Sequence, residues 1–289
     1  MVIEDRIKAF DKLGKFLIDF CDETSNSNHP LENIIKSSIS YNGWFTSNNI
    51  RCSISAICNN LSSIKLFSWI SSYSIPVKVK KNVSIIMAGN IPLVGFNDFL
   101  CVLISGHRSI IKLSSKDNRL FSPIIEELIK IEPRFEDDIK IVEKVENFDA
   151  VIATGSNESF KYFEYYFKDY PTLLRKSRTS VAILTGEESL DERKALANDI
   201  FLYYGLGCRN VTKLYVPKNY DLNLLFEVFF EYQDVILNNK YANNYDYYRT
   251  IYIMANQDIL DNGFLILKED KALHSPVAVL HYEYYDEKE

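Results

Sequence analysis

The sequence has few of the features that build disulfide frameworks, metal sites and membrane spans. Its five cysteines form no CxxC pair and no spacing typical of metal ligands. An odd, scattered set of cysteines indicates free thiols in a reducing cytosol. No apolar run reaches the ~18 residues of a membrane span. The charged residues 1–6 lack the apolar segment of a secretory signal. These features predict a cytoplasmic protein with no membrane span and no metal.

Excess positive charge is also missing. The chain of 289 residues has 33 Lys and Arg against 39 Asp and Glu, a net charge of −6. This balance gives no electrostatic argument for a nucleic-acid partner. The hydrophobic fraction of 47% is high enough for a sizeable core. The length allows one large domain or two of medium size.

The N-terminal part of the sequence is predicted to be helical. Apolar residues recur at three- and four-residue steps over residues 3–21 and again over residues 49–71. A polar stretch ending in His29 and Pro30 indicates a loop between them. We expect both helices to be packing elements without chemistry.

Strands and helices alternate after Pro76. Short strands are predicted at residues 83–87, 109–113, 139–142 and 150–153, with helices at 95–105, 119–131 and 157–168. This alternation indicates an α/β fold with a parallel sheet and right-handed crossovers. Polar residues or glycines follow the strands, at the edge where open α/β sheets bind ligands.

The second half of the chain continues the alternation. Strands are predicted at residues 179–184, 212–216 and 276–280. A helix with a capping box should begin at Ser189 and end at Gly205, and another should cover residues 221–238. The tyrosine-rich residues 241–252 show no clear period. We attribute them to biased composition and not to an aromatic binding site.

Cys208 stands between a predicted helix and a predicted strand, after Gly205 and Gly207, which allow a sharp turn. A thiol on such a loop is well placed to be a nucleophile. The alternative is a small buried hydrophobic residue, the usual state of a single cysteine. A cysteine hydrolase would need a paired histidine, and nothing in the sequence pairs His107 or His274 with Cys208.

Five short motifs occur between these elements. Their order resembles that of the aldehyde dehydrogenase superfamily, and the resemblance covers roughly residues 76–280. The closest resemblance is to its acyl-CoA reductase branch, the LuxC-like fatty-acyl reductases. The motifs are Gly89-Asn90-Ile91-Pro92, Lys112-Leu113-Ser114-Ser115, Thr154-Gly155-Ser156, Gly205-Leu206-Gly207-Cys208 and Ser275-Pro276-Val277.

The resemblance implies an aldehyde-dehydrogenase-like α/β fold. A Rossmann-type NAD(P)-binding domain would cover residues 1–176, and an α/β catalytic domain would cover residues 177–289. Cys208 would be the acyl-carrying nucleophile. Asn90 and the Cys208 backbone N–H would hold the oxyanion of the tetrahedral intermediate. Read without the resemblance, Asn90 is an ordinary turn residue.

The resemblance also implies a cofactor site. Lys112, which alone would be read as a solvated charge, would reach the cofactor ribose, with Ser114 beside it. Ser115 takes the place of a glutamate that binds the ribose 2′-hydroxyl in many NAD-using members. The missing carboxylate and the charge of Lys116 favour NADPH.

Gly155 and Ser156 match residues that border the cofactor in the family, although a turn and a helix N-cap explain them equally well. The sequence departs from the superfamily at two other places. Its general base, a glutamate, has no counterpart in residues 174–178, and the glutamate that binds the nicotinamide ribose is replaced by Ala272. A hydrolytic dehydrogenase needs the base to activate water, whereas a CoA-linked reductase does not.

We therefore predict NADPH-dependent reduction of a fatty acyl-CoA, or another acyl thioester, to an aldehyde through a cysteine thioester. One alternative is another aldehyde dehydrogenase branch that oxidises aldehydes or reduces an acyl phosphate. The other is a catalytically inactive nucleotide- or acyl-binding protein of the same fold. The expected partners are the acyl thioester, a second copy of the chain or an acyl-transferring enzyme.

The end of the sequence predicts a catalytic domain that is short at its C-terminus. Little follows Val277, and the last four residues are all charged. We expect residues 281–289 to be a solvated tail and not a buried closing strand. Apolar surface near the Cys208 loop would then stay uncovered.

Overall fold

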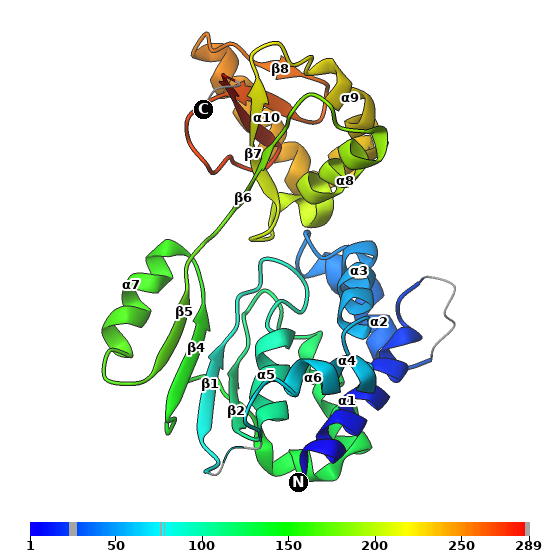
Figure 1. Ribbon diagram of the computed structural model, residues 1–289, viewed down its shortest axis with the longest axis vertical. Helices are drawn as coiled ribbons and strands as arrows, with labels where there is room; N and C mark the ends of the chain where they lie inside the picture. Colours follow the sequence, from blue (N-terminus) through cyan, green and yellow to red (C-terminus); the bar gives the residue numbers. More distant parts are fainter. Residues whose placement is uncertain (23–27, 76, 78, 287–289) are drawn as a thin grey trace. The chain divides into compact units, whose positions relative to one another are not determined.

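The chain divides into two compact units, unit 1 (Met1–Ser177) and unit 2 (Arg178–Glu289) (Figure 1). The computed structural model describes residues 1–22, 28–75, 77 and 79–286. Pro76, where the α/β region was predicted to begin, and residues 287–289 of the predicted tail lie outside the described residues. No helix among the described residues is long and apolar enough to cross a membrane.

Unit 1 begins with helices that contribute apolar side chains to its core. They are α1 (Ile3–Ile18), α2 (Pro30–Ser37), the 3-10 helix η1 (Ser38–Ser40), α3 (Ser47–Cys58) and α4 (Ser63–Ile70). The three- and four-residue spacing on α1 buries Phe10, Leu13 and Leu17. The core is therefore shared between these helices and the sheet that follows.

Two predictions for this region were only partly correct. His29 lies outside the helices as expected, but Pro30 starts α2, and His29 caps it because its Nδ1 accepts a hydrogen bond from the Leu31 N–H (3.2 Å). The single helix over residues 49–71 is two helices. Ser62 caps the second one by accepting from the Lys65 N–H.

Sheet A of unit 1 has five parallel strands in the order β3-β2-β1-β4-β5. The strands are β1 (Asn82–Ile86), β2 (Arg108–Lys112), β3 (Ile139–Ile141), β4 (Ala150–Thr154) and β5 (Thr172–Arg175). This order, with β1 at the centre, matches the first five strands of the Rossmann order 3-2-1-4-5-6. The edge strand β5 was not predicted, because its first two residues are exposed and it has no buried alternation.

The crossover helices of unit 1 are α5 (Phe96–Ser105), α6 (Phe121–Ile131) and α7 (Asn157–Tyr166), with the 3-10 helix η2 (Pro133–Asp138) before β3. Helix α5 packs on β1 and β2, and α7 packs on β5 (Figure 1). Phe99 of α5 meets Phe121 of α6 edge to face, with 5.6 Å between ring centroids. These contacts fix the positions of the strand ends.

Unit 2 is built on sheet B, whose strand order is β6-β7-β10-β9-β8. The strands are β6 (Ser180–Ile183), β7 (Val211–Pro217), β8 (Leu260–Asp261), β9 (Ile266–Glu269) and β10 (Val279–Tyr285). All neighbours are parallel except the β8–β9 pair. The helices are α8 (Leu190–Phe201), α9 (Asn223–Phe229) and α10 (Asn239–Met254), with 3-10 helices η3 (Leu202–Gly205) and η4 (Phe230–Leu237).

The tyrosine-rich segment forms helix α10, which the sequence analysis missed. Asn238 caps it by accepting from the backbone N–H groups of Lys240 and Tyr241. Tyr241 and Tyr245 are buried, one helical turn apart, whereas Tyr247 is exposed. Since tyrosines occur on both faces, the helix has no apolar stripe that a periodicity search detects.

The predicted solvated tail was wrong for residues 281–285. They belong to β10, which pairs with β7 on one side and β9 on the other. Leu280 and His281 are buried, and Glu283 accepts a hydrogen bond from the fully buried Lys213 (2.8 Å). Lys213 on β7 therefore holds the acidic Glu283 in the strand. The prediction failed because this partner is distant in sequence and no local pattern indicates it.

Candidate active site

Three loops of unit 1 leave sheet A at the same edge. In the strand register, Ile86 of β1 lies beside Lys112 of β2 and Ala153 of β4. The carboxyl ends of these strands therefore meet, and residues 87–95, 113–120 and 155–156 follow them. The predicted residues of unit 1 are all on these loops or at the strand end.

Asn90 is exposed on the loop between β1 and α5. Two bonds hold the backbone after it. The Ser53 hydroxyl donates to the Pro92 carbonyl (2.8 Å), and the Leu93 N–H donates to Asp117 Oδ2 (2.7 Å). Leu93 has a left-handed backbone (φ 55°), which is unusual for a leucine. This loop is thus fixed from both neighbouring segments, with the Asn90 side chain at the surface.

The loop after β2 packs closely against Gly89. A Cβ atom at position 89 would overlap the Ser114 Oγ and lie 2.8 Å from the Ser114 Cβ, so only glycine fits. Ser114 Oγ accepts a hydrogen bond from the Lys116 N–H (3.2 Å). Lys112, Ser115 and Lys116 are exposed beside it. The structure therefore brings together Gly89 and Ser114, which belong to two different motifs of the sequence.

Gly155 and Ser156 follow β4. The Gly155 N–H donates to the Arg175 carbonyl (3.2 Å), and Ser156 Oγ accepts from the Ser159 N–H (3.2 Å) as the N-cap of α7. A Cβ at position 155 would lie 3.0 Å from the side chains of Ser159 and Phe163. Both residues therefore have local structural roles, and they also lie at the edge where the other loops meet.

Arg175 was not expected as a site residue, although its segment was noted for lacking a carboxylate. It ends β5, and its guanidinium forms an ion pair with Asp98 of α5 (2.5 Å). The Asp98 side chain is 11% exposed and that of Arg175 32% exposed. An arginine held by a buried carboxylate cannot serve as a general base, because its charge persists at any physiological pH. No local pattern identifies this pair, since 77 residues separate its members.

Cys208 lies in unit 2, in the turn before β7, and its side chain is exposed. The buried Asn210 organises this turn. Its Oδ1 accepts from the Gly207 N–H (2.7 Å), and its Nδ2 donates to the carbonyls of Asp199 (2.7 Å) and Leu202 (2.9 Å). One side chain thereby ties the Cys208 turn to the end of α8. Asn210 lies two residues after the Gly205–Cys208 motif, and its burial (5% exposed) indicates this role.

Three consecutive left-handed residues precede the turn. They are Tyr203 (φ 53°), Tyr204 (φ 58°) and Gly205 (φ 74°). Helix α8 ends at Phe201, so Gly205 does not end it as predicted. Gly207 does not have a positive φ; its N–H is instead bonded to Asn210. Two left-handed tyrosines are costly, and backbone strain of this kind concentrates at functional sites.

The segment that resembles the end of the family pattern lies against β7. Thr212 donates to the Leu273 carbonyl (2.7 Å), and Lys213 donates to the Asp270 carbonyl. Ala272 and His274 are exposed. Within unit 2, this segment is therefore hydrogen-bonded to the start of β7, the strand that directly follows the Cys208 turn.

The other four cysteines differ from Cys208 in exposure. Cys21, Cys52, Cys58 and Cys101 are partly buried. Burial raises the pKa of the Cys52 and Cys101 thiols, and burial together with the neighbouring Cys21 raises the pKa of Cys58 to about 12. Since the thiolate is the nucleophile, these shifts disfavour reaction at those three positions.

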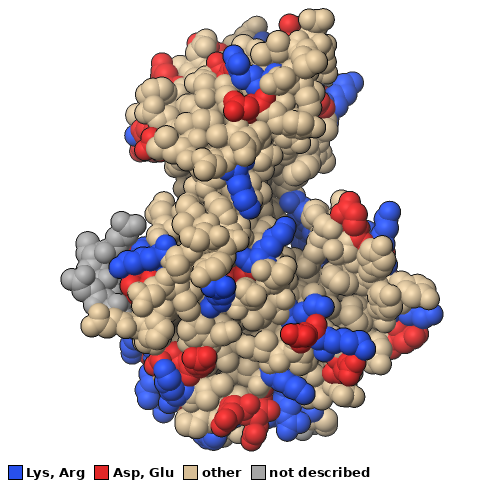
Figure 2. All heavy atoms as spheres, turned by 180° about the vertical axis from the view of Figure 1, so that it is seen from behind, with Lys and Arg blue, Asp and Glu red and all other residues tan. Residues whose placement is uncertain are grey.

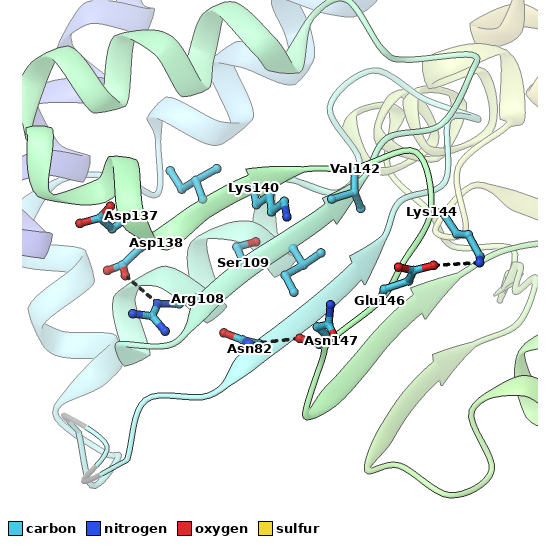
Figure 3. Close-up of a pocket in the computed structure, with 12 residues that line it drawn as sticks. Asn82, Arg108, Ser109, Asp137, Asp138, Lys140, Val142, Lys144, Glu146 and Asn147 are labelled. Carbon is cyan, nitrogen blue, oxygen red and sulfur yellow. Dashed lines mark hydrogen bonds and ion pairs between the residues drawn. The ribbon is translucent and has the colours of Figure 1, made fainter.

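A cavity of about 260 Å³ lies on unit 1 along β1, β2 and β3, and it contains none of the predicted site residues (Figure 3). Asp138 at its wall pairs with Lys80 (2.5 Å) and approaches Arg108 (3.8 Å). On the face in Figure 2, acidic and basic side chains are intermixed over unit 1. The cavity is lined by Asn82, Arg108, Ser109, Ile110, Asp137, Asp138, Ile139, Lys140, Val142, Lys144, Glu146 and Asn147.

Comparison with solved structures identifies the fold. The chain aligns over 99% of its length with aldehyde dehydrogenase 21 from Physcomitrella patens in complex with succinate, covering 69% of that chain (TM-score 0.73, 14% identity). It aligns over its whole length with an NADP complex of glyceraldehyde-3-phosphate dehydrogenase from Methanocaldococcus jannaschii, covering 72% of that chain (TM-score 0.68, 13% identity). The predicted aldehyde-dehydrogenase-like α/β fold with a Rossmann-type sheet is confirmed.

Comparison of sequences identifies the family. The long-chain acyl-protein thioester reductase of Aliivibrio fischeri is 26% identical over 246 residues, which are 76% of this chain. The chain spans about half of that relative, 51% of its length. The model of the family described as acyl-CoA reductase (LuxC) matches residues 12–230, a range that includes Asn90 and Cys208. The chain therefore belongs to the acyl-CoA reductase (LuxC) family of oxidoreductases.

Proposed function

We propose that this protein reduces a fatty acyl thioester, such as an acyl-CoA, to the aldehyde with NADPH, through a thioester on Cys208. Unit 1 would bind the cofactor and unit 2 would carry the nucleophile. The proposal draws on the family and on the relative named for acyl-protein thioester reduction. The observation that carries it is the exposure of the Cys208 thiol on an ordered turn before β7.

A nucleophilic thiol must be accessible, and it must be held so that attack needs little reorganisation. Cys208 meets both requirements, because Asn210 fixes the turn through three hydrogen bonds while the thiol faces outwards. The partly buried Cys52, Cys58 and Cys101 are less accessible, and burial raises the pKa of their thiols, which disfavours the thiolate.

The first chemical step is attack of the Cys208 thiolate on the thioester carbonyl carbon. The tetrahedral oxyanion requires fixed donors, and we assign that role to the Asn90 amide and the Cys208 backbone N–H. Collapse breaks the bond to coenzyme A, which leaves as a thiolate and takes up a proton. The acyl group then remains as a thioester on Cys208.

The residues at the carboxyl edge of sheet A fit a dinucleotide phosphate. Gly89 is buried against Ser114, so the loops after β1 and β2 pack closely at this edge. Lys112 and Lys116 are exposed and positively charged, and the short Ser115 side chain leaves room for a 2′-phosphate. When bound, NADPH would supply the hydride that reduces the enzyme thioester. The resulting thiohemiacetal on Cys208 would expel the thiolate and release the aldehyde.

The ion pair of Arg175 with Asp98 supports reduction over hydrolysis. A hydrolytic dehydrogenase needs a carboxylate base to activate water against the enzyme thioester. The segment where the superfamily has this base contains Arg175, whose charge is neutralised by Asp98. Water would therefore compete poorly with the return of coenzyme A or with reduction.

The test is an anaerobic assay of the purified protein with NADPH and a series of acyl-CoAs, combined with mass spectrometry of the protein after exposure to labelled acyl-CoA. We expect aldehyde production, and one acyl group on the peptide that contains Cys208. Cys208→Ala should abolish both while leaving NADPH binding intact. Cys101→Ala is the matched control and should retain turnover.

Three outcomes would contradict the proposal in different ways. Acylation at Cys21, Cys52, Cys58 or Cys101 would move the nucleophile elsewhere. Faster turnover of an aldehyde or an acyl phosphate than of any acyl thioester would indicate another branch of the superfamily. Nucleotide binding without acylation or turnover would indicate a binding protein that has lost its activity.

A further inference from the structure

Asp117 is a buried carboxyl group that the proposed chemistry does not use. It lies in the loop after β2, its residue is 7% exposed, and its Oδ2 accepts the Leu93 N–H at 2.7 Å. Its Oδ1 is buried and has no hydrogen-bond partner among the described residues. A buried carboxyl group with one unpaired oxygen is costly, so a compensating role is expected.

We propose that Asp117 is a positioning residue that couples the loop bearing Asn90 to the loop bearing Ser115. This inference rests on the proposed function, because it gives those two loops the oxyanion and cofactor roles. The hydrogen bond from Leu93 to Asp117 directly joins residues 87–95 to residues 113–120. The tight contact of Gly89 with Ser114 joins the same two loops a second time.

The geometry explains why a hydrogen-bond acceptor is needed at position 117. Leu93 is left-handed, and its N–H points into the protein three residues after Asn90. Without an acceptor, that N–H would be buried and unpaired, and the loop would relax towards a conformation with a negative φ. Asp117 supplies the acceptor, so the exposed position of Asn90 depends on a residue of the cofactor loop.

Two uncharged side chains bond the backbone next to Asp117 and next to Leu93. Asn42 donates to the Lys116 carbonyl (3.2 Å), and Ser53 donates to the Pro92 carbonyl. On its own segment Lys116 is exposed, and the Arg119 guanidinium lies 3.2 Å from the Tyr41 ring centroid. Burial raises the pKa of Asp117 to about 7, and the Leu93 N–H opposes this shift.

The raised pKa gives the coupling a pH dependence with a definite sign. The folded state binds the Asp117 proton more tightly than the unfolded state, so its contribution to stability is full below the unfolded pKa of about 4. That contribution is lost as the pH rises through about 7. Above this pH the ionised carboxylate gains hydration when the loops separate, so opening of the loops becomes easier.

The experiment is hydrogen–deuterium exchange on peptides covering residues 87–95 and 113–120, with NADPH titration and acylation kinetics in parallel. In Asp117→Ala we expect faster exchange in both peptides, weaker NADPH binding, and acylation slower by on the order of tenfold to a hundredfold. Asp117→Asn keeps an acceptor for Leu93 and should restore most of the protection. In the natural protein, exchange corrected for its intrinsic rate should rise through about pH 7, and in Asp117→Asn this rise should disappear.

The matched control is Asp138→Asn, which alters another buried aspartate of unit 1 at the opposite, amino-terminal end of β3. It should leave the exchange of both loop peptides unchanged. Unchanged loops in Asp117→Ala, or faster exchange spread evenly over unit 1, would overturn the coupling. If the loops respond as expected but the natural protein reduces no acyl thioester, the coupling stands and the proposed function fails.

Discussion

The Asn90 loop of unit 1 and the Cys208 turn of unit 2 both present an exposed polar side chain, but they are held in different ways. The Asn90 loop is held by neighbours from other segments, with Ser53 on Pro92 and Asp117 on Leu93. The Cys208 turn is held mainly by one residue two positions further on, Asn210.

This difference shows two solutions to one requirement, a reactive group at the surface on a rigid backbone. Support spread over several segments joins the Asn90 loop to each of them, so the loss of one contact, such as that of Asp117, loosens the loop while the bond from Ser53 remains. Support concentrated in one buried amide is more compact and fails at a single position. The strain in Tyr203 and Tyr204 adds to this dependence, since the left-handed backbone persists only while the surrounding bonds hold it.

The largest effect is expected for Asn210→Ala. The change removes three hydrogen bonds and leaves the carbonyls of Asp199 and Leu202 without that donor. We expect about 3 kcal/mol of lost stability in unit 2 and a large loss of acylation rate at Cys208. Denaturant unfolding and acylation kinetics measure the two effects.

The matched control is Asn262→Ala, another turn asparagine of unit 2, whose Oδ1 accepts from the N–H groups of Phe264 and Leu265. It should lower stability by about 1 kcal/mol and leave acylation unchanged. Equal effects of the two variants on acylation would remove the special role given to Asn210.

A smaller effect is expected for Gly89→Ala, which tests the distributed support in unit 1. The new Cβ would overlap Ser114, so the two loops must separate. We expect a loss of about 2 kcal/mol in stability, as for overpacking elsewhere, and weaker NADPH binding. Thermal unfolding and cofactor titration report the change.

The double variant Gly89→Ala with Ser114→Gly separates packing from backbone effects. Removing the Ser114 side chain takes away the two atoms nearest to the new methyl group, and the Lys116 Cβ remains at 3.0 Å. The second change should therefore recover part of the lost stability. A purely additive result would contradict direct contact as the cause.

The smallest effect on stability is expected for Ser115→Glu, because the side chain is exposed. Its effect on cofactor choice should be clear. A carboxylate repels the 2′-phosphate and can accept from a 2′-hydroxyl, so preference should move towards NADH by on the order of tenfold, since exposed charges interact by about 1–4 kcal/mol. Fluorescence titration with both cofactors measures the shift. Equal or tighter NADH binding by the unaltered protein would refute the NADPH preference. If local charge is the cause, Lys116→Glu should also shift the preference towards NADH.

Elements with a regular pattern could be predicted from the sequence. The alternation around β1, α5 and β2 was correct to within one or two residues, because their apolar runs are bounded by glycine and polar residues. The capping box at Ser189 was also confirmed, with both of its hydrogen bonds present. Each motif of the candidate site is a run of three or four consecutive residues. The motifs and their order could therefore be recognised from the sequence alone.

What the sequence could not predict depends on distant partners. The pair of Arg175 with Asp98 joins a strand end to a helix 77 residues earlier. The burial of Asp117 and Asn210 follows from packing and not from their neighbours in sequence. The helix α10 and residues 281–285 of β10 were missed for the same reason, since what covers Tyr241 and pairs with Glu283 lies elsewhere in unit 2.

The position of β10 has a consequence for how the chain is made. Sheet A can pair all its strands once residue 175 has been synthesised, because its last strand is at an edge. In sheet B, β10 is the fifth strand in the sequence but lies between β7 and β9. Until residues 279–285 leave the ribosome, β7 has an open edge next to apolar side chains such as Leu214 and Val216. Unit 1 can therefore fold during translation, while the half-built unit 2 is the part of the nascent chain that chaperones must protect from aggregation.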